Sequence, residues 1–254
     1  MTGVQTCALP IFDYFFDLIG NVFPKIAVDR SQIVFSFSGV RPLPHHDDLQ
    51  PGFVSRDYRI VPGKLGKADL LSLVGGKWTT FRALAAHIST DVLALLGQPR
   101  TVDTKSLEIG GGRGYPRTPV ARDNWITAHA GFVGTARAAE LFDRYGTRAT
   151  EVIDAVDAAE DSALAYAPDF SRLEVEHIIA TESVVHLADI LLRRTSLAFT
   201  GDVSVELLEE LAEIAAGVLD WTQERRDDEI RHATTLLADA HGVHLSHTVS
   251  AVPR

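Results

Sequence analysis

The sequence contains very little sulfur, with one cysteine (Cys7) and one methionine in 254 residues. A single cysteine cannot form an intramolecular disulfide, so no disulfide framework is expected. The chain also lacks an excess of basic residues, because 24 Lys and Arg stand against 34 Asp and Glu and give a formal net charge of −10. This balance argues against a nucleic-acid partner, since binding to phosphate backbones needs a basic face.

Long apolar runs are absent as well. No uninterrupted run approaches the roughly 18 residues that a membrane-spanning helix needs, so no span is expected. The composition, 46% hydrophobic and 23% charged, is that of an ordinary globular protein, and the length suits one large domain or two small ones.

The first eleven residues, MTGVQTCALPI, do not resemble natural protein sequence. Thr2 to Ile11 are the translation of a common short-read sequencing adapter, and a preceding GTG codon supplies Met1. Residues 1–11 are therefore interpreted as an adapter-derived artefact, which removes Cys7 from any functional argument. On this interpretation the authentic chain begins near Phe12, and an N-terminal portion is missing.

Hydrophobic periodicity divides the rest of the chain into a mixed first part and a helical second part, an α+β fold class. In residues 12–110 we expect helices over 12–23 and 79–96, with strands within 31–40, 55–61 and 68–76. Residues 111–117 are expected to be a linker, 118–240 a helical C-terminal domain, and 241–254 a loose tail. Two apolar faces are expected in the helical part: Ile178, Val185, Ala188 and Leu192; and Leu207, Leu211, Ile214, Val218 and Trp221.

The segment SLVGGKWTTFRALAAH, residues 72–87, places Gly75, Gly76 and Lys77 between a strand and a helix. It is not a P-loop, because Leu71 replaces the first glycine of that motif and Trp78 replaces its hydroxyl residue. It is not a dinucleotide fingerprint either, since no Gly-x-Gly-x-x-Gly follows a strand. Two interpretations remain open: an anion bound at the helix N-terminus, or a tight turn with a solvated lysine.

Two arginines lie at other expected strand ends. Arg41 follows one strand and Arg56 begins the next, so both could join Lys77 in one phosphate- or carboxylate-binding basin. Taken singly, each arginine is more often a surface ion pair, and Arg56 beside Asp57 especially so.

Three segments in this order, FSGVRPL, SRDYRI and LLSLVGGKWTTFRALAAH, resemble the FAD-dependent glycerol-3-phosphate dehydrogenases. The later segment EVEHIIATESVVHLADILLRRTSLAF resembles the helical cap domain of the same family, so the resemblance covers roughly residues 12–235. It implies that residues 12–110 are the C-terminal part of an FAD- and substrate-binding α/β domain, followed by an all-α cap domain. The related glycerol-3-phosphate oxidases share these motifs, so the electron acceptor stays open.

The resemblance also implies a reaction and the residues that perform it. Glycerol 3-phosphate would be oxidised to dihydroxyacetone phosphate, with hydride transfer to FAD and electrons passed to a quinone-type acceptor. Arg41 and Lys77 would be catalytic, and together with Arg56 they would bind the substrate. The residues expected to contact the cofactor are Gly75, Gly76, Lys77, Trp78 and Thr79. The family has an apolar residue, often Leu, at the position of Trp78.

Several parts of the family's machinery have no match in this sequence. The Gly-x-Gly-x-x-Gly turn for the FAD pyrophosphate and the catalytic histidine belong to the missing segment, so no base is assigned and the lone chain is expected to be inactive. The resemblance implies a cytoplasmic protein and leaves peripheral membrane contact and a homodimer open. Two other classes also remain open: a stand-alone helical interaction module, and an unrelated phosphate-handling enzyme that uses the same three cations.

Other polar clusters are expected to be structural or solvated. His45, His46, Asp47 and Asp48 are adjacent in a proline-rich loop, and His241, His244 and His247 repeat in a polar tail, so no metal site is expected. His177 and His186 are expected to be structural. Glu182 and Asp189 stand at helical spacing from Arg193 and Arg194, which indicates ion pairs.

Overall fold

The computed structural model describes residues 5–39, 57–158 and 160–245. The chain divides into two compact units. Residues 1–38, 118–144 and 149–254 form the first, here called the helical unit, and residues 39–117 with 145–148 form the second, the hairpin unit.

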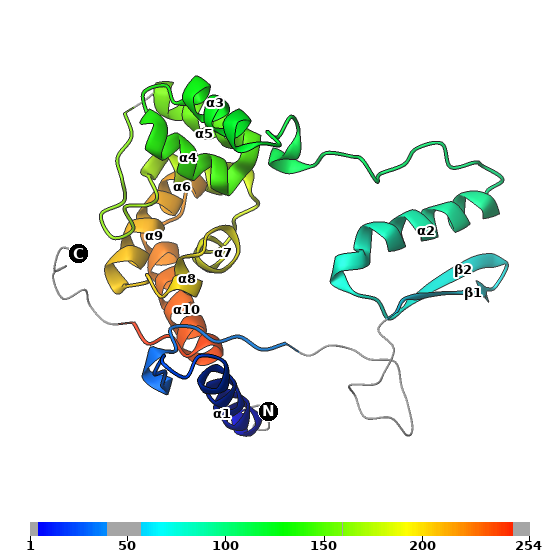
Figure 1. Cartoon of the computed structure of the whole chain (residues 1–254), viewed down its shortest axis with the longest axis horizontal. Helices are drawn as coiled ribbons and strands as arrows, with labels where there is room; N and C mark the ends of the chain where they lie inside the picture. Colours follow the sequence, from blue (N-terminus) through cyan, green and yellow to red (C-terminus); the bar gives the residue numbers. More distant parts are fainter. Residues whose placement is uncertain (1–4, 40–56, 159, 246–254) are drawn as a thin grey trace. The chain divides into compact units, whose positions relative to one another are not determined.

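The helical unit contains short and medium-length helices (Figure 1). Its elements are α1 (Gln5–Val22), η1 (Arg30–Gln32), α3 (Pro119–His129), α4 (Gly134–Tyr145), α5 (Ala149–Ala158), α6 (Arg172–Thr181), α7 (Leu187–Asp189), the π-helical η6 (Ile190–Arg194), α8 (Leu197–Thr200), α9 (Val205–Leu219) and α10 (Gln223–His241). Ser171, Ser204 and Thr222 cap the N-termini of α6, α9 and α10 by accepting a backbone N–H. Such caps satisfy donors that have no partner within the helix.

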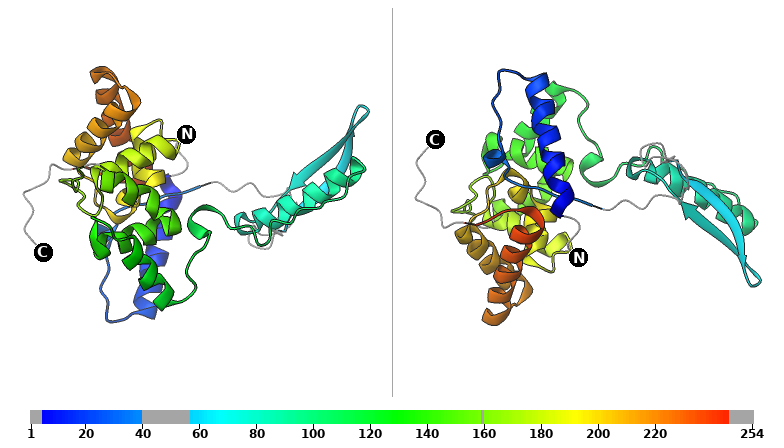
Figure 2. Two further views of the ribbon diagram at one scale, coloured as in Figure 1. Left: turned by 90° about the horizontal axis from the view of Figure 1, so that it is seen from above. Right: turned by 90° about the horizontal axis from the view of Figure 1, so that it is seen from below.

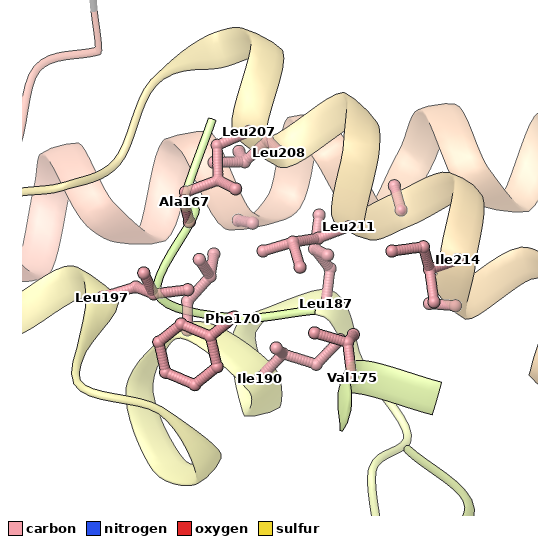
Figure 3. Packing of buried hydrophobic residues seen from close by; sticks show 14 of the residues in the cluster. Ala167, Phe170, Val175, Leu187, Ile190, Leu197, Leu207, Leu208, Leu211 and Ile214 are labelled. Carbon is pink, nitrogen blue, oxygen red and sulfur yellow. The ribbon is translucent and has the colours of Figure 1, made fainter. Parts of the chain in front are cut away.

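The core of the helical unit lies mainly between α6, α7, η6 and α9 (Figure 3). Leu207, Leu211 and Ile214 of α9 are at most 2% exposed, and Val218 and Trp221 pack against the same cluster, so the face expected on this helix is confirmed. Full burial of one such side chain contributes about 1.5–3 kcal/mol relative to exposure. This face therefore supplies a large share of the stability of the unit.

The apolar face of residues 173–194 is divided among three elements instead of one continuous helix. α6 ends at Thr181, and Ser183 takes a positive φ of 56° before the chain resumes at α7. Ile178 and Ala188 are buried as expected, but Val185 is 59% exposed, and its place on the buried face is a wrong prediction. The break changes the direction of the chain, so helical spacing no longer relates Val185 to Ile178.

The hairpin unit is built on the strands β1 (Arg59–Leu65) and β2 (Ala68–Val74), which pair antiparallel. Gly66 opens the turn between them with a φ of +63°, a conformation that a two-residue turn requires and glycine adopts without strain. The chain then forms η3 (Trp78–Thr80), α2 (Phe81–Leu95) and η4 (Gly110–Gly112). α2 lies along the hairpin, as further views show (Figure 2).

The strand expected within residues 31–40 is a wrong prediction for the described residues, which form η1 and an extended stretch without strand pairing. A strand needs a neighbouring strand, and Ser36 instead forms its backbone hydrogen bond with His241.

The glycine triplet of η4 makes a very close backbone contact with η5 (Gly146–Arg148). A Cβ atom on Gly111 would lie 1.8 Å from the carbonyl oxygen of Tyr145, and one on Gly146 would lie 2.5 Å from the carbonyl oxygen of Gly111. The Thr147 hydroxyl lies 3.0 Å from the Gly111 oxygen and 2.8 Å from that of Arg113. These glycines therefore serve close packing of two backbones.

We expect residues 118–245 to fold when expressed alone, and residues 57–117 to remain largely unprotected. The buried residues of the described chain all fall between Ile126 and Leu237, and none of the described residues 57–117 is buried. A two-stranded hairpin whose side chains are not buried is marginally stable at best. Amide hydrogen exchange on the two separate pieces checks this, and equal protection in both would contradict it.

Candidate functional site

The turn between β2 and α2 has a backbone that requires its two glycines. Gly75 takes a φ of +74° and Gly76 a φ of +116°, both in the region that other residues avoid. A Cβ atom on Gly75 would also lie 3.0 Å from the carbonyl oxygen of Asp57. The turn thus brings the residues just before β1 against the end of β2.

Lys77 stands at the start of η3, where the helical path towards α2 begins. Neither Lys77 nor Thr80 supplies a side-chain cap to the helix that follows it. The first N–H groups of a helix have no acceptor within the helix, and the positive end of its dipole lies there. This helix start is therefore suited to an anion, with the Lys77 ammonium beside it.

The Lys77 ammonium lies 3.6 Å from the Asp57 carboxylate. The two side chains are 50% and 85% exposed, so this pair contributes at most about 1 kcal/mol. The hairpin register explains why they meet: Arg59 pairs with Val74, which places the residues before β1 and those after β2 at the same end. The sequence suggested Arg56 as the partner of Asp57 and gave no sign of this pairing, because it depends on the register.

Arg41 and Arg56 lie outside the described residues, so the three-cation basin stays a prediction. Asp57, which follows Arg56 directly in the sequence, does lie beside Lys77. The roles of Gly75, Gly76, Lys77, Trp78 and Thr79 in binding a cofactor also stay predictions. Trp78 is 90% exposed, and its ring lies 6.3 Å from that of Phe81.

A chain of polar side chains next to the turn was missed by the sequence analysis. The Tyr58 hydroxyl lies 3.5 Å from Nδ1 of His87, and Nε2 of His87 lies 3.7 Å from the Asp91 carboxylate. The spacing of four residues between His87 and Asp91 on α2 was the available signal. Because Tyr58 precedes β1, these side-chain contacts link the hairpin to α2 and help to hold the turn between them.

The other side of α2 is open and apolar. A cavity of about 700 Å³ lies between α2 and residues 98–109, and among its lining residues are Phe81, Ala85, Leu93, Val102, Leu107 and Ile109. At its border Arg100 donates to the carbonyl oxygen of Ala86 at 3.2 Å. The large exposed apolar side chains here, such as Val102 at 71%, leave a surface that further protein could cover.

The remaining polar clusters make structural contacts. Arg193 pairs with Asp189 at 2.7 Å, as the spacing indicated, and His186 lies 2.9 Å from the buried carboxylate of Glu229. Burial alone would raise the pKa of Asp189, but the N–H groups of His186 and Val185 and the charge of Arg193 lower it. The ionised Asp189 therefore accepts both N–H groups at the start of α7.

Neither a metal-binding cluster nor a membrane-spanning helix is found in the described part of the chain. It contains no group of three or more His, Cys, Asp or Glu side chains arranged to hold a metal ion. His45, His46, Asp47, Asp48 and His247 lie outside it. No helix within the described ranges is both long enough and apolar enough to cross a bilayer.

The helical part of the chain is similar to a known protein domain. Residues 102–226 match the family model of the C-terminal domain of alpha-glycerophosphate oxidase. This range contains α3 to α9 and the beginning of α10. The helical unit is thus largely a domain of this type.

Similarity to glycerol-3-phosphate dehydrogenases extends over most of the chain. A glycerol-3-phosphate dehydrogenase of Synechocystis sp. is 26% identical over 224 residues, 86% of this chain and 40% of that protein. One of Pseudomonas tolaasii is 31% identical over 73% of this chain and 36% of its own length, and the aerobic enzyme of Bacillus subtilis is 27% identical over 90% and 42%. The chain is a homologue of the glycerol-3-phosphate dehydrogenases, as its motifs indicated, and it spans about two fifths of their length.

Proposed function

We propose that this chain is the C-terminal part of an FAD-dependent glycerol-3-phosphate dehydrogenase, which oxidises sn-glycerol 3-phosphate to dihydroxyacetone phosphate. FAD, when bound, supplies the hydride acceptor, and the electrons pass on to a quinone-type acceptor. The observation that carries the proposal is the turn Gly75–Gly76–Lys77, where two positive φ angles place a lysine at an uncapped helix start. The homology to glycerol-3-phosphate dehydrogenases on both sides of this turn supports it.

The residues of this chain would act as anion-binding groups. Arg56 and Arg41 suit the phosphate dianion, because a guanidinium offers two parallel N–H donors to two oxygens. Arg41 would also favour negative charge on the alcohol oxygen that loses its proton. The helix start from Gly75 to Thr79 would lie at the pyrimidine edge of the flavin, since the N–H groups at a helix start without a side-chain cap and the Lys77 ammonium favour an anion.

The exposure of Lys77 and of α2 is consistent with a site that is completed by a part of the protein outside this sequence. Phe81 and Leu95 of α2 are 58% and 53% exposed, although both are large apolar side chains. Additional protein on this surface would remove water from around Lys77 and strengthen the interaction of its charge with a substrate. A cytoplasmic location belongs to the same proposal, while peripheral contact with the membrane and a homodimeric state stay open.

A glycerol-3-phosphate oxidase is the second candidate, because the matching domain is named after alpha-glycerophosphate oxidase. The two candidates share substrate and flavin and differ in the electron acceptor. The two are separated in the longer protein, meaning the full-length protein of which this chain would be the C-terminal part. The measurement is the formation of hydrogen peroxide with and without a quinone. A non-catalytic helical module fits less well, because the similarity extends over as much as 90% of the chain.

The substrate assignment is tested by replacing Arg56 in the longer protein. We expect Arg56→Ala to raise KM for glycerol 3-phosphate by about tenfold or more with a smaller change in kcat, because a phosphate contact far from the reacting carbon gives uniform binding. Steady-state kinetics measure both constants. Glycerol is the control substrate, since it has no phosphate: an equal loss of activity towards glycerol would show that Arg56 does not bind phosphate.

A further inference from the structure

The side chain of Tyr58 lies next to both the glycine–lysine turn and α2. A Cβ atom on Gly76 would lie 3.6 Å from Cβ of Tyr58 and 3.9 Å from a methyl carbon of Leu84, so the backbone of the turn lies beside both residues. Leu84 and His87 are three residues apart on α2 and therefore share one face of that helix. Tyr58 thus stands where the turn and this face of α2 come together.

His87 makes the contact between α2 and Tyr58. The Tyr58 hydroxyl lies 3.5 Å from Nδ1 of His87, and the two rings meet edge to face with 5.9 Å between their centroids. On the other side of the imidazole, Nε2 lies 3.7 Å from the Asp91 carboxylate. A carboxylate favours a proton on the nitrogen that faces it, so Nδ1 of the neutral ring is left to accept from the Tyr58 hydroxyl.

The residue before Tyr58 contacts the turn in two ways. The Asp57 carboxylate lies 3.6 Å from the Lys77 ammonium, and a Cβ atom on Gly75 would lie 3.0 Å from the Asp57 carbonyl oxygen. Because Asp57 and Tyr58 are adjacent, holding the Tyr58 side chain restricts the backbone from which the Asp57 carboxylate reaches Lys77. All of these residues belong to the hairpin unit, so the arrangement lies within one compact unit.

We propose that His87 is a positioning residue for Lys77 and acts on it through Tyr58 and Asp57. The inference rests on the proposed function, which gives Lys77 its role beside the substrate and the flavin. The Lys77 side chain is 50% exposed, and its flexible four-carbon stem needs a partner to hold the ammonium at the helix start. A charge that is already in place stabilises a transition state better than one that must first be ordered.

Paired substitutions in the longer protein test this route. His87→Ala is expected to lower kcat with glycerol 3-phosphate by about fivefold, the fold-change that corresponds to one hydrogen bond, with a smaller change in KM. In a protein that already carries Lys77→Ala, the same substitution should leave kcat unchanged, because no ammonium remains to be positioned. A purely structural role would lower kcat equally in both proteins, and that outcome would overturn the proposal.

Two conservative variants separate the hydrogen bond from the packing of the rings. His87→Asn keeps an acceptor near the position of Nδ1 and should recover most of kcat, whereas Tyr58→Phe keeps the ring and should lose as much as His87→Ala. Ser89→Ala is the matched control and should match the unaltered protein, because Ser89 lines the apolar cavity on the other side of α2. Equal losses in His87→Asn and His87→Ala would contradict the proposal.

Failure of the proposed function gives a different result. The unaltered longer protein would then not oxidise glycerol 3-phosphate, or Lys77→Ala alone would leave kcat unchanged, and the positioning role would fall with it. If Lys77→Ala lowers kcat while His87→Ala does not, the proposed function holds and the positioning role of His87 is wrong.

Discussion

Glu174→Ala is expected to lower the free energy of unfolding of the helical unit by about 3–5 kcal/mol, the usual cost of removing one partner from a buried ion pair. The Glu174 side chain has no exposed surface. Arg144 contacts both of its carboxylate oxygens at 2.9 and 3.0 Å, and Arg137 binds one of them. Both arginines also donate to the carbonyl oxygen of Asp169, so one carboxylate holds α4 and the Asp169 loop to α6.

The loss is large because the two arginines have little access to water. Their side chains are 20% and 26% exposed, and the Arg144 guanidinium lies 4.0 Å from the centre of the Phe170 ring. Burial alone would lower the pKa of Arg137, but the charges and hydrogen bonds of Glu174 and Glu140 raise it. Without Glu174 the cations stay charged and lose the group that compensates their burial.

Urea unfolding of the chain and of the separate 118–245 piece measures this loss. Glu176→Ala is the matched control on the same helix, since Glu176 pairs with Arg172 at the surface with side chains 31% and 51% exposed. That pair should contribute about 0–1 kcal/mol. Equal losses from the two substitutions would show that the buried cluster contributes no more than a surface ion pair.

Lys77→Ala in the longer protein is expected to lower kcat by about 10²–10³, or roughly 3–4 kcal/mol of transition-state stabilisation. Under the proposed function, negative charge would develop beside the turn as the alcohol loses its proton and the hydride leaves C2. An ammonium fixed at this point interacts more strongly with the transition state than with the bound substrate, so kcat falls and not only KM.

Rapid mixing of the enzyme with glycerol 3-phosphate, followed by the bleaching of flavin absorbance, reports the hydride step directly. Lys67→Ala offers a control, because Lys67 lies at the far end of the hairpin, in the turn between Leu65 and Ala68. An unaltered bleaching rate in Lys77→Ala would show that Lys77 forms only a surface ion pair, with Asp57 at 3.6 Å. The turn would then be structural only.

Local features of the fold could be read from the sequence. Pro24 correctly indicated the end of α1, which stops at Val22, and Gly97 the end of α2, where it takes a φ of +67°. The periodicity of Leu207, Leu211 and Ile214 gave the buried face of α9. Each of these depends on neighbours within a few positions, which the linear sequence contains.

Features that depend on distant partners could not be read in this way. Residues 33–38 have strand-like alternation, but the group that meets Ser36 belongs to His241 at the other end of the chain. In the candidate site, the glycine turn and Lys77 were predictable from spacing. The approach of Asp57 to Lys77 was not, because the register of two strands decides it.

The contact between Gly111 and Gly146 constrains how this region can evolve. The carbonyl group of Tyr145 excludes a side chain at Gly111, and the backbone of Gly111 excludes one at Gly146. Neither glycine can be substituted alone without an overlap, and changing both to alanine would create two overlaps and remove none. A run of three glycines usually marks a segment that tolerates insertions. Here one extra residue would move Gly111 away from its position against the Tyr145 backbone and bring another residue there. Among homologues, length variation should therefore accumulate on either side of this triplet and spare the triplet itself.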